Sequence, residues 1–402
     1  MRSAVVVGAG IGGLAAAGAL ARTGWQVTLL EQRERIRPAP GAVLLWPGGL
    51  RALRSLGLDE GLDAVATPVH TAGLRRPDGR WLHKGSPADG MTPYVVHGED
   101  LHDALVAGLG ERVDLRPGVA VRTVPGREGR PAVGDGRATW EADLVVAADG
   151  VGSTVRQRLV PDSRPVSGGY AAWRAVIPWY RAPRLPDSTP AAGETLSVGQ
   201  RFRYASLGER RSAEVSGRGG ICWLATVPGA ARPEPPEVQL SLLRRWFAGW
   251  HAPVAQLLAV TEPDDLVQQD VSELSPLPAA FAFPAGAGGY VLLGDAAHAL
   301  ADHLGQGPSV ALEDAATLQA LVRDASPGPA LAGALRAYQR ARRRRAARLA
   351  RQSRRVAAVL EGAGGRLGLR ARRVALGTVA PRLFKAAAAG ASDWRPLAGS
   401  DS

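Results

Sequence analysis

Three glycines at fixed spacing lie near the N-terminus. Gly8, Gly10 and Gly13 follow a short apolar run and precede a stretch of small residues. In this pattern the first glycine permits a tight turn, the second lets a pyrophosphate approach the backbone, and the third lets helix and strand pack closely. The phosphates then meet free N–H groups at the positive end of the helix. Glu31 follows at the distance where an acidic side chain binds a ribose hydroxyl, so the pattern predicts a dinucleotide site.

Two later apolar segments each end in an aspartate beside a glycine. "ADLVVAADG" ends at Asp149 and Gly150, with Arg156 shortly after, and "GYVLLGD" ends at Gly294 and Asp295. Asp-Gly pairs also form ordinary turns. Each pair taken alone therefore has two interpretations, a ligand contact or a simple turn.

The segments around these motifs have the patterns of elements that would position them. Residues 4–10 form a β-branched run ending in glycines, residues 13–24 a helix of small residues, and residues 25–32 a second strand. Together they predict one βαβ unit. Further on, residues 308–323 and 334–360 have helical patterns.

The middle of the chain has a different character. Residues 165–275 contain short alternating segments separated by Pro- and Gly-rich turns, and residues 70–96 have the pattern of a hairpin. We therefore expect an α/β fold into which an antiparallel sheet is inserted.

Composition, cysteine count and charge limit the classes of protein to which the chain can belong. The chain has 402 residues, 46% of them hydrophobic and 21% charged, which is typical of a globular protein. A single cysteine, Cys222, excludes an intrachain disulfide framework and favours a reducing compartment. The net charge of +12 is almost entirely Arg, and aromatic residues do not interleave with the basic run near the C-terminus, so we expect no nucleic-acid partner. The glycine spacing argues against a cleaved leader, and we expect a cytoplasmic protein with no membrane span.

Taken together, these motifs resemble the group A flavoprotein monooxygenases, the family of p-hydroxybenzoate hydroxylase, salicylate hydroxylase and zeaxanthin epoxidase. The resemblance covers most of the chain and includes the N-terminal glycines, the Asp-Gly pair, "YAAWRAV", the Gly-Asp pair, "GQG…ALEDA" and the Arg-rich helix. It implies FAD as cofactor and NADH or NADPH as reductant. It further implies that O2 oxygenates an aromatic or polycyclic small molecule through a flavin C4a-hydroperoxide.

The resemblance also implies how the chain is organised. We expect a Rossmann-like FAD-binding domain, an inserted antiparallel-sheet substrate domain and a C-terminal helical region, in a monomer or homodimer. The expected bounds are residues 1–69, 97–164 and 276–330 for the first, 70–96 and 165–275 for the second, and 331–402 for the third.

Cofactor contacts follow residue by residue from the family motifs. Asp295 would accept hydrogen bonds from ribityl hydroxyls, and Asp149 would lie near the pyrophosphate, where family members also handle NAD(P)H. Backbone N–H groups of residues 305–307 would face the flavin N1/O2 edge, and the helix starting at Pro308 would stabilise the reduced, anionic flavin. The expected cofactor contacts are Gly8, Gly10, Ile11, Gly12, Gly13, Glu31, Gln32, Arg33, Asp149, Gly150, Arg156, Gly294, Asp295, Gly305, Gln306 and Gly307.

Four positions depart from the family pattern. The family usually has Asn at the position of Gly48, an FAD-contacting Arg at that of Gly98, Pro at that of Asp302 and a small residue at that of Pro308. Losing the Arg weakens cofactor binding by about 1.5–3 kcal/mol unless another cation compensates, and we considered Arg33 and Arg112 for this role.

Asp302 is the departure with the largest consequence. In the family this loop passes over the flavin near C4a, where oxygen reacts. A carboxylate there would repel reduced flavin, act as a proton donor if protonated, or face solvent, and His303 beside it is a candidate partner.

The substrate region is assigned from alternation along the strands. Arg201 and Arg203 share one face of their strand and Phe202 and Tyr204 the other, and the pattern leaves open which face looks inward. Expected substrate contacts are Trp46, Arg201, Tyr204, Trp223 and Asp302. Candidate catalytic residues are Asp302, His303, Arg201 and Tyr204, and we expect no metal.

Several features keep two interpretations. Arg174 would act at the domain interface or pair structurally with a carboxylate, whereas His298 and the Arg-rich helix are expected to be structural, with the helix solvated. As alternatives to a monooxygenase, the departures from the pattern suggest an oxidase or dehydrogenase of the same fold, or a non-catalytic scaffold.

Overall fold

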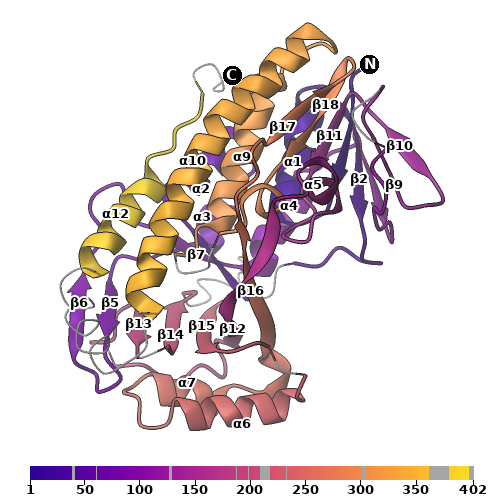
Figure 1. Ribbon diagram of the computed structural model, residues 1–402. Helices are drawn as coiled ribbons and strands as arrows, with labels where there is room; N and C mark the ends of the chain where they lie inside the picture. Colours follow the sequence, from indigo (N-terminus) through magenta and orange to yellow (C-terminus); the bar gives the residue numbers. More distant parts are fainter. Residues whose placement is uncertain are drawn as a thin grey trace.

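The computed structural model describes residues 1–38, 41–59, 61–125, 129–186, 188–197, 199–208, 218–231, 233–300, 304–361 and 380–397. Figure 1 shows two sheet-based bodies joined end to end, with the long helix α10 running alongside. Within the described part of the chain, no helix combines the length and apolar character needed to cross a bilayer.

A six-stranded sheet forms the centre of the first body. All neighbouring strands are parallel except the antiparallel edge pair β17–β18. The spatial order is β17 (Ala282–Ala285), β18 (Gly288–Leu292), β11 (Leu144–Ala147), β1 (Ser3–Val7), β2 (Gln26–Glu31) and β8 (Val113–Pro117). Its central strands are buried along almost their whole length, which explains their uninterrupted apolar sequences.

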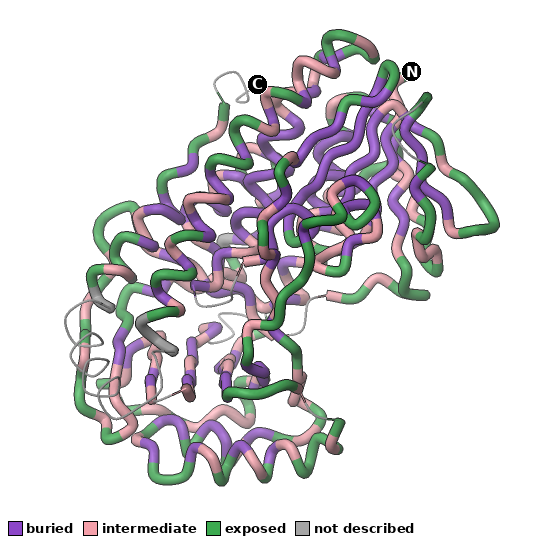
Figure 2. Tube along the Cα trace, viewed as in Figure 1, coloured by how far each residue is buried: buried purple, intermediate pink, exposed green. Residues whose placement is uncertain are grey.

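Helices cover this sheet and set the position of its loops. Helix α1 (Ile11–Arg22) packs on α9 (Gly307–Val322), and α9 packs on α10 (Pro329–Glu361). Small residues along α1 allow the close approach, and nine of its twelve residues are buried. Figure 2 shows the burial concentrated in the sheet and these inner helices, with exposed residues along the outer side of α10.

A seven-stranded sheet forms the second body. It is antiparallel apart from the parallel pair β13–β5, which joins the predicted hairpin to the rest of the sheet. The order is β16 (Val267–Ser275), β12 (Arg164–Pro178), β15 (Gly220–Pro228), β14 (Arg201–Ser206), β13 (Ala192–Leu196), β5 (Ala72–Arg75) and β6 (Trp81–Gly85). Helices α6 (Pro236–Trp246) and α7 (Val254–Val260) cover its outer face (Figure 1).

A small third sheet contributes two helix starts near the junction of the two bodies. Its order is β3 (Ala42–Leu45), β7 (Tyr94–His97) and β4 (Thr67–Pro68). Helix α2 (Pro47–Ser55) follows β3, with a proline in its first turn, and α4 (Gly98–Ala107) follows β7. The sequence analysis expected a hairpin over residues 70–96. Residues 72–85 form one and join the seven-stranded sheet, whereas residues 94–96 pair within this small sheet.

The remaining elements are short, except one helix within the expected C-terminal helical region. The short ones are α3 (Leu62–Val65), β9 (Ala132–Gly134), β10 (Thr139–Glu141), α5 (Thr154–Leu159), the 3-10 turn Pro263–Asp265 and α8 (Asp295–His298). Helix α12 (Ala380–Ser392) packs on α10 and α2. The α/β class with an antiparallel insertion and a helical C-terminus is confirmed.

Candidate active site

Three loops leave the six-stranded sheet from the same edge. The register pairs Val7 with Ala147 and Ala147 with Leu292, so the carboxyl ends of β1, β11 and β18 lie side by side. The N-terminal glycines, the Asp-Gly pair and the Gly-Asp pair follow these ends directly. In open α/β sheets this edge is where ligands bind.

Two glycines of the N-terminal turn are required for close packing, and a third leaves the start of α1 open. Gly8 has φ +96°, and a Cβ there would lie 2.5 Å from the Ala148 carbonyl oxygen. A Cβ at Gly13 would lie 1.8 Å from the Gly8 oxygen, so this glycine lets α1 approach β1. A Cβ at Gly10 would meet nothing within 4 Å, and α1 has no capping side chain and no acid in its first turn. The open, uncapped helix start fits a pyrophosphate.

Two neighbours in the fingerprint pack against protein. A Cβ at Gly12 would lie 2.6 Å from Leu293 Cδ2 and 3.3 Å from the Ala311 Cβ, so Gly12 lets α1 approach α9. Ile11 is half-buried and packs against the main core. Gly12 therefore has a packing role, and its expected cofactor contact stays a prediction.

Glu31 braces the glycine turn. Its Oε2 accepts a hydrogen bond from the Ala9 N–H at 2.8 Å, and its Oε1 accepts one from the Arg33 N–H at 2.9 Å. Gln32 and Arg33 are exposed beside it. Arg112 precedes β8, whose first residue pairs with Val27 near the start of β2, so it lies at the amino edge of the sheet and cannot compensate for Gly98.

Asp149 is a buried carboxylate with an unused acceptor. Its Oδ2 accepts a hydrogen bond from the Thr154 N–H at 2.8 Å, whereas its buried Oδ1 has no partner among the described residues. Burial raises the pKa of Asp149 above its ordinary value, against the hydrogen bonds from Ser153 and the backbone. A Cβ at Gly150 would meet nothing within 4 Å. A buried acceptor beside open backbone fits a ligand that donates a hydrogen bond.

Arg156 joins two of the loops instead of facing the open edge. It is fully buried, and it donates to the Ala296 carbonyl at 3.3 Å and to the Val151 carbonyl at 2.5 Å. Its guanidinium is enclosed by protein, which does not favour the expected cofactor contact of Arg156, and that contact stays a prediction. Arg156 holds the Asp-Gly loop against α8.

The Gly-Asp pair lies against the start of α9. Gly294 has φ +60° and donates its N–H to Asp314 at 2.9 Å. Asp295 is exposed, and a Cβ at Gly307 would lie 3.9 Å from its Oδ1. The Asp295 carboxylate therefore lies beside the first residue of α9, which has no acid in its first turn.

Residues 304–307 form the loop that leads into α9, and contacts hold it on several sides. Trp46 donates its indole N–H to the Leu304 carbonyl at 3.1 Å and its backbone N–H to Ser309 Oγ at 2.9 Å. A Cβ at Gly305, where φ is +57°, would lie 3.4 Å from Leu44 Cδ2 and 4.0 Å from Arg203 Nη1. Asp302 and His303 lie outside the described residues.

One cross-strand row of the seven-stranded sheet faces this loop. The register places Arg174 opposite Leu224, Leu224 opposite Arg203, and Arg203 opposite Glu194. Arg203 is the residue nearest Gly305 in this row, and Glu194 pairs with both Arg201 and Arg203. The row therefore places Arg174 and Arg203 on the side of the sheet that faces the first body.

Arg174 has no carboxylate partner among the described residues. Its Nε is buried without a hydrogen-bond partner there, and a Cβ at Gly41 would lie 3.2 Å from its Cδ. The Gly41 carbonyl accepts the Gly98 N–H at 2.8 Å. Of the two interpretations of Arg174, the structural ion pair is not seen among the described residues, and its side chain reaches the surroundings of Gly98.

Tyr204 and Trp223 lie on the opposite face of the same sheet. Both belong to the cluster formed with α6 and α7, where Trp223 stacks on Phe202 and donates to Thr261 Oγ1 at 3.0 Å. Because side chains alternate along a strand, Tyr204 and Trp223 point outward with Phe202, away from the face of Arg203. This placement does not favour the predicted substrate contacts of Tyr204 and Trp223, which stay predictions.

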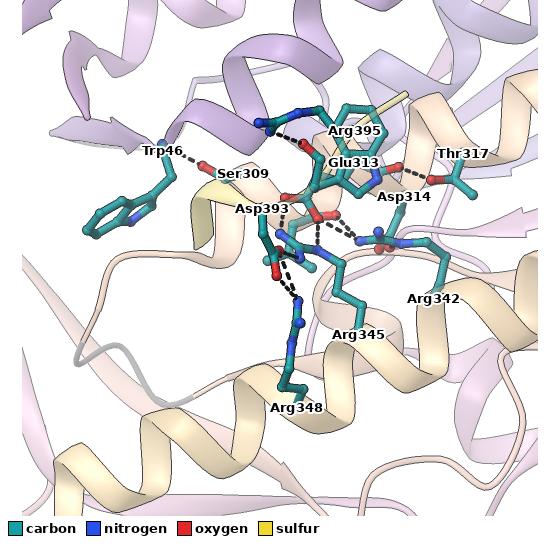
Figure 3. Close-up of polar contacts among 12 residues, drawn as sticks. Trp46, Ser309, Glu313, Asp314, Thr317, Arg342, Arg345, Arg348, Asp393 and Arg395 are labelled. Carbon is teal, nitrogen blue, oxygen red and sulfur yellow. Dashed lines mark hydrogen bonds and ion pairs between the residues drawn. The ribbon is translucent and has the colours of Figure 1, made fainter. Parts of the chain in front are cut away.

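The acids of α9 form a buried ion network with the Arg-rich helix (Figure 3). Arg345 Nη2 donates to Glu313 Oε1 at 2.7 Å, and Arg342 Nε donates to Asp314 at 2.5 Å. His298 Nε2 lies 2.5 Å from Asp314, in keeping with the structural role expected for it. The prediction that the Arg-rich helix is solvated is wrong for this inner face.

Charge pairing sets the state of this network. Burial alone would raise the pKa of Asp314, but the charges of Arg342 and His298 outweigh it and hold that pKa below its ordinary value. The two carboxylates likewise raise the pKa of Arg342 against the effect of burial. The ion pairs of Arg342 with Glu313 and Asp314 thereby fix α10 to α9.

The fold and this convergence of loops can now be compared with known proteins. The family model described as "FAD binding domain" matches residues 1–186 and 250–353. Aurachin C monooxygenase/isomerase of Stigmatella aurantiaca is 30% identical over 362 residues, covering 85% of each chain. The 3-amino-4-hydroxybenzoate 2-monooxygenase of Streptomyces cremeus is 31% identical over 367 residues, covering 88% of this chain and 86% of that one.

Solved structures share the whole architecture. HpxO of Klebsiella pneumoniae, in complex with FAD and uric acid, superposes with a TM-score of 0.80 at 24% identity and covers 97% of this chain and 96% of that one. The chain belongs to the group A FAD-dependent monooxygenase family, as the sequence motifs indicated. FAD is the cofactor of that family's binding domain, and the open edge described above fits it.

Proposed function

We propose that this protein is an FAD-dependent monooxygenase that uses NADH or NADPH and O2 to oxygenate an aromatic or polycyclic small molecule. The observation that carries the proposal is the convergence of three loops at one sheet edge, opposite a sheet face that carries Arg174 and Arg203. Relatives over most of the chain have names that describe monooxygenases. The bound FAD would supply the redox chemistry with O2.

The residues of the open edge would bind FAD in an extended arrangement. Backbone N–H groups at the start of α1, around Gly10, would bind the pyrophosphate, and Glu31 would exchange a backbone partner for a ribose hydroxyl. Asp149 Oδ1, buried and without a partner, would accept a hydrogen bond from the cofactor. Asp295 beside α9 would accept from the ribityl chain, and the positive end of α9 would stabilise negative charge on the ring system.

The sheet face opposite the loop would bind the substrate. Beside the cationic row lies an apolar patch that includes Val176, Cys222, Ala205 and Leu44. A flat apolar molecule would lie on this patch, and Arg203 and Arg174 would bind an anionic or strongly accepting edge of it. We therefore expect an aromatic substrate that carries a carboxylate, an acidic phenol or a similar group.

The protein's own groups would then orient and shield the reactants. Arg203 would hold the acidic edge of the substrate next to Gly305, which fixes the distance between the substrate and the flavin loop. Leu44 and Leu304 would keep water away from that contact.

The test begins with the cofactor. Purified protein should show a flavin spectrum or bind added FAD stoichiometrically, and Asp295→Ala should weaken that binding by about tenfold or more through loss of a charge-assisted acceptor. Asp114→Ala, at an exposed carboxylate of β8, is the matched control. A wild-type protein that does not bind FAD contradicts the proposal.

The second stage tests oxygen insertion. Aromatic acids are screened for stimulation of NADH or NADPH oxidation, and hits are repeated under ¹⁸O2. Incorporation of one ¹⁸O atom into product supports a monooxygenase. Reduction by NAD(P)H with all O2 recovered as H2O2, for every substrate that binds, would instead support the oxidase alternative.

A further inference from the structure

The C-terminal end of the described chain reaches the loop that leads into α9. We define the C-terminal clamp as residues 380–397, which comprise α12 and the segment that follows it. Gln306, between the two glycines of the loop, donates its Nε2 to the Ala387 carbonyl of α12 at 3.1 Å. Its side chain is buried, with an exposed fraction of 3% for the residue, so it points away from the open edge and into the clamp.

The Gln306 contact is specific to the clamp. Gln306 Oε1 is buried and has no hydrogen-bond partner among the described residues, so the bond to Ala387 is the one that orients this amide. Leu304, two residues earlier, packs in a cluster with Ala387 of α12, Val356 of α10 and Leu74 of β5. Both anchored side chains of the loop therefore rest on α12.

Polar contacts fix the clamp at its other end. Arg51 of α2 donates to the carbonyls of Ser392 and Trp394, at 2.9 Å for Trp394. Asp393 pairs with Arg345 and Arg348, and Arg345 is the same residue that pairs with Glu313 on α9 (Figure 3). The clamp is thus tied by full charges to the helix whose first residues form the loop.

A glycine makes room for this arrangement. A Cβ at Gly48 would lie 2.5 Å from Glu313 Oε1 and 2.7 Å from the Ala391 carbonyl oxygen. Any larger residue at position 48 would displace either the buried carboxylate or the clamp. The departure at Gly48 is therefore explained by the packing of α2, α9 and α12 at one point.

We infer that the C-terminal clamp is part of the cofactor site, and that Gln306 is a positioning residue through which the clamp holds the backbone N–H groups of residues 305–307 toward FAD. This inference rests on the proposed function. Because the coupling is reciprocal, FAD binding should in turn tighten α12.

Gln306, the N-cap residue of α9, and Gln319, within α9, form a matched pair for the test. Gln319 also donates its Nε2 to an alanine carbonyl, that of Ala19 at 3.2 Å, and is also buried, but it lies three turns further along the helix. Gln306→Met and Gln319→Met each remove one such bond from a side chain of similar length. A merely structural role predicts that both variants lower the melting temperature of the cofactor-free protein to a similar extent and leave FAD affinity alike.

The expected result separates the two variants. Gln306→Met should raise the FAD dissociation constant by about tenfold, whereas Gln319→Met should change it by less than about threefold. Hydrogen exchange of peptides from residues 380–397 should slow when FAD is added to wild type and to Gln319→Met, and should not slow in Gln306→Met. These readouts require no turnover.

Other outcomes overturn the inference. Equal FAD affinity in Gln306→Met and wild type, or an equal loss in both variants, reduces Gln306 to a structural residue. If Gln306→Met does not fold, Asp393→Asn decides instead: its side chain is 42% exposed, and it should weaken FAD binding about two- to fivefold, with Asp114→Asn as control. Failure of the wild type to bind FAD would contradict the proposed function itself, and would be seen before any variant is made.

Discussion

The two faces of the seven-stranded sheet differ in what they hold. The outer face carries Phe202 and Trp223, stacked at 5.3 Å between ring centroids and packed against α6 and α7. The inner face carries Arg174, Leu224 and Arg203 in one row, with a single carboxylate to balance them. One face is a packed apolar core, whereas the other carries arginines that face the first body.

This difference shows that one strand can contribute to stability with one face and to ligand recognition with the other. In β14 the residues alternate Arg201, Phe202, Arg203, Tyr204, so consecutive side chains serve opposite tasks. A change on the outer face should alter the free energy of unfolding and leave activity intact. A change on the inner face should alter binding and leave stability nearly intact.

The largest expected effect is on the outer face. Phe202→Ala should lower the free energy of unfolding by about 3–5 kcal/mol, because it empties a fully buried ring site between Trp223 and Phe247. Urea unfolding of the cofactor-free protein measures this loss. A loss below about 1 kcal/mol would show that the outer face is not the packed core described here.

The next effect belongs to the inner face. Arg203→Gln should lower kcat/KM for an acidic aromatic substrate by about 10- to 100-fold, since a charge-assisted hydrogen bond contributes about 1.5–3 kcal/mol. A neutral analogue of the same substrate should lose much less, and Arg164→Gln, at the exposed start of β12, is the control. An equal loss for the charged and neutral compounds would refute recognition of an anionic edge.

A smaller effect is expected at Trp223. Trp223→Phe removes the hydrogen bond to Thr261 and part of the stacking on Phe202, so the free energy of unfolding should fall by about 1–2 kcal/mol. Steady-state kinetics should be unchanged within a factor of two. A selective rise in KM without loss of stability would instead indicate that Trp223 contacts the substrate.

The smallest effect at neutral pH is expected for Tyr204→Phe, which should leave kcat unchanged. Burial raises the pKa of Tyr204 to about 12, against the opposing charge of Arg75. Tyr204 ionises near pH 10 in the unfolded chain, so its contribution to stability is present below pH 10 and is lost as pH rises toward 12. The variant should therefore be less sensitive to alkaline unfolding in that window. A kinetic pKa that disappears in the variant would instead support a catalytic tyrosine.

Much of the cofactor edge could be predicted because its signals are local. Gly8 and Gly13 are required by contacts between adjacent elements of one βαβ unit, and the apolar runs of β1, β11 and β18 indicate buried strands. The motifs at Asp149 and Asp295 come directly after those strands. By contrast, Gly12 and Arg156 belong to the same motifs but turn to α9 and α8, which spacing alone could not reveal.

The C-terminal contacts could not be predicted for a different reason. Gln306 and Ala387 are 81 positions apart, and no period or motif joins them. The Arg-rich stretch looked like a solvated surface because burying arginines requires partners, and the partners Glu313 and Asp314 lie on another helix. The bounds expected for the domains, and the roles of Asp302 and His303, stay predictions.

The sequence by itself determined the class of fold, the cofactor edge and the division of β14 into two kinds of side chain, because turns, caps and alternation are properties of neighbouring residues. Only the tertiary structure decided which kind faces the first body. That choice depends on where α6 and α7 bury the aromatic residues, and once they cover one face, the arginines of the other are left for the site.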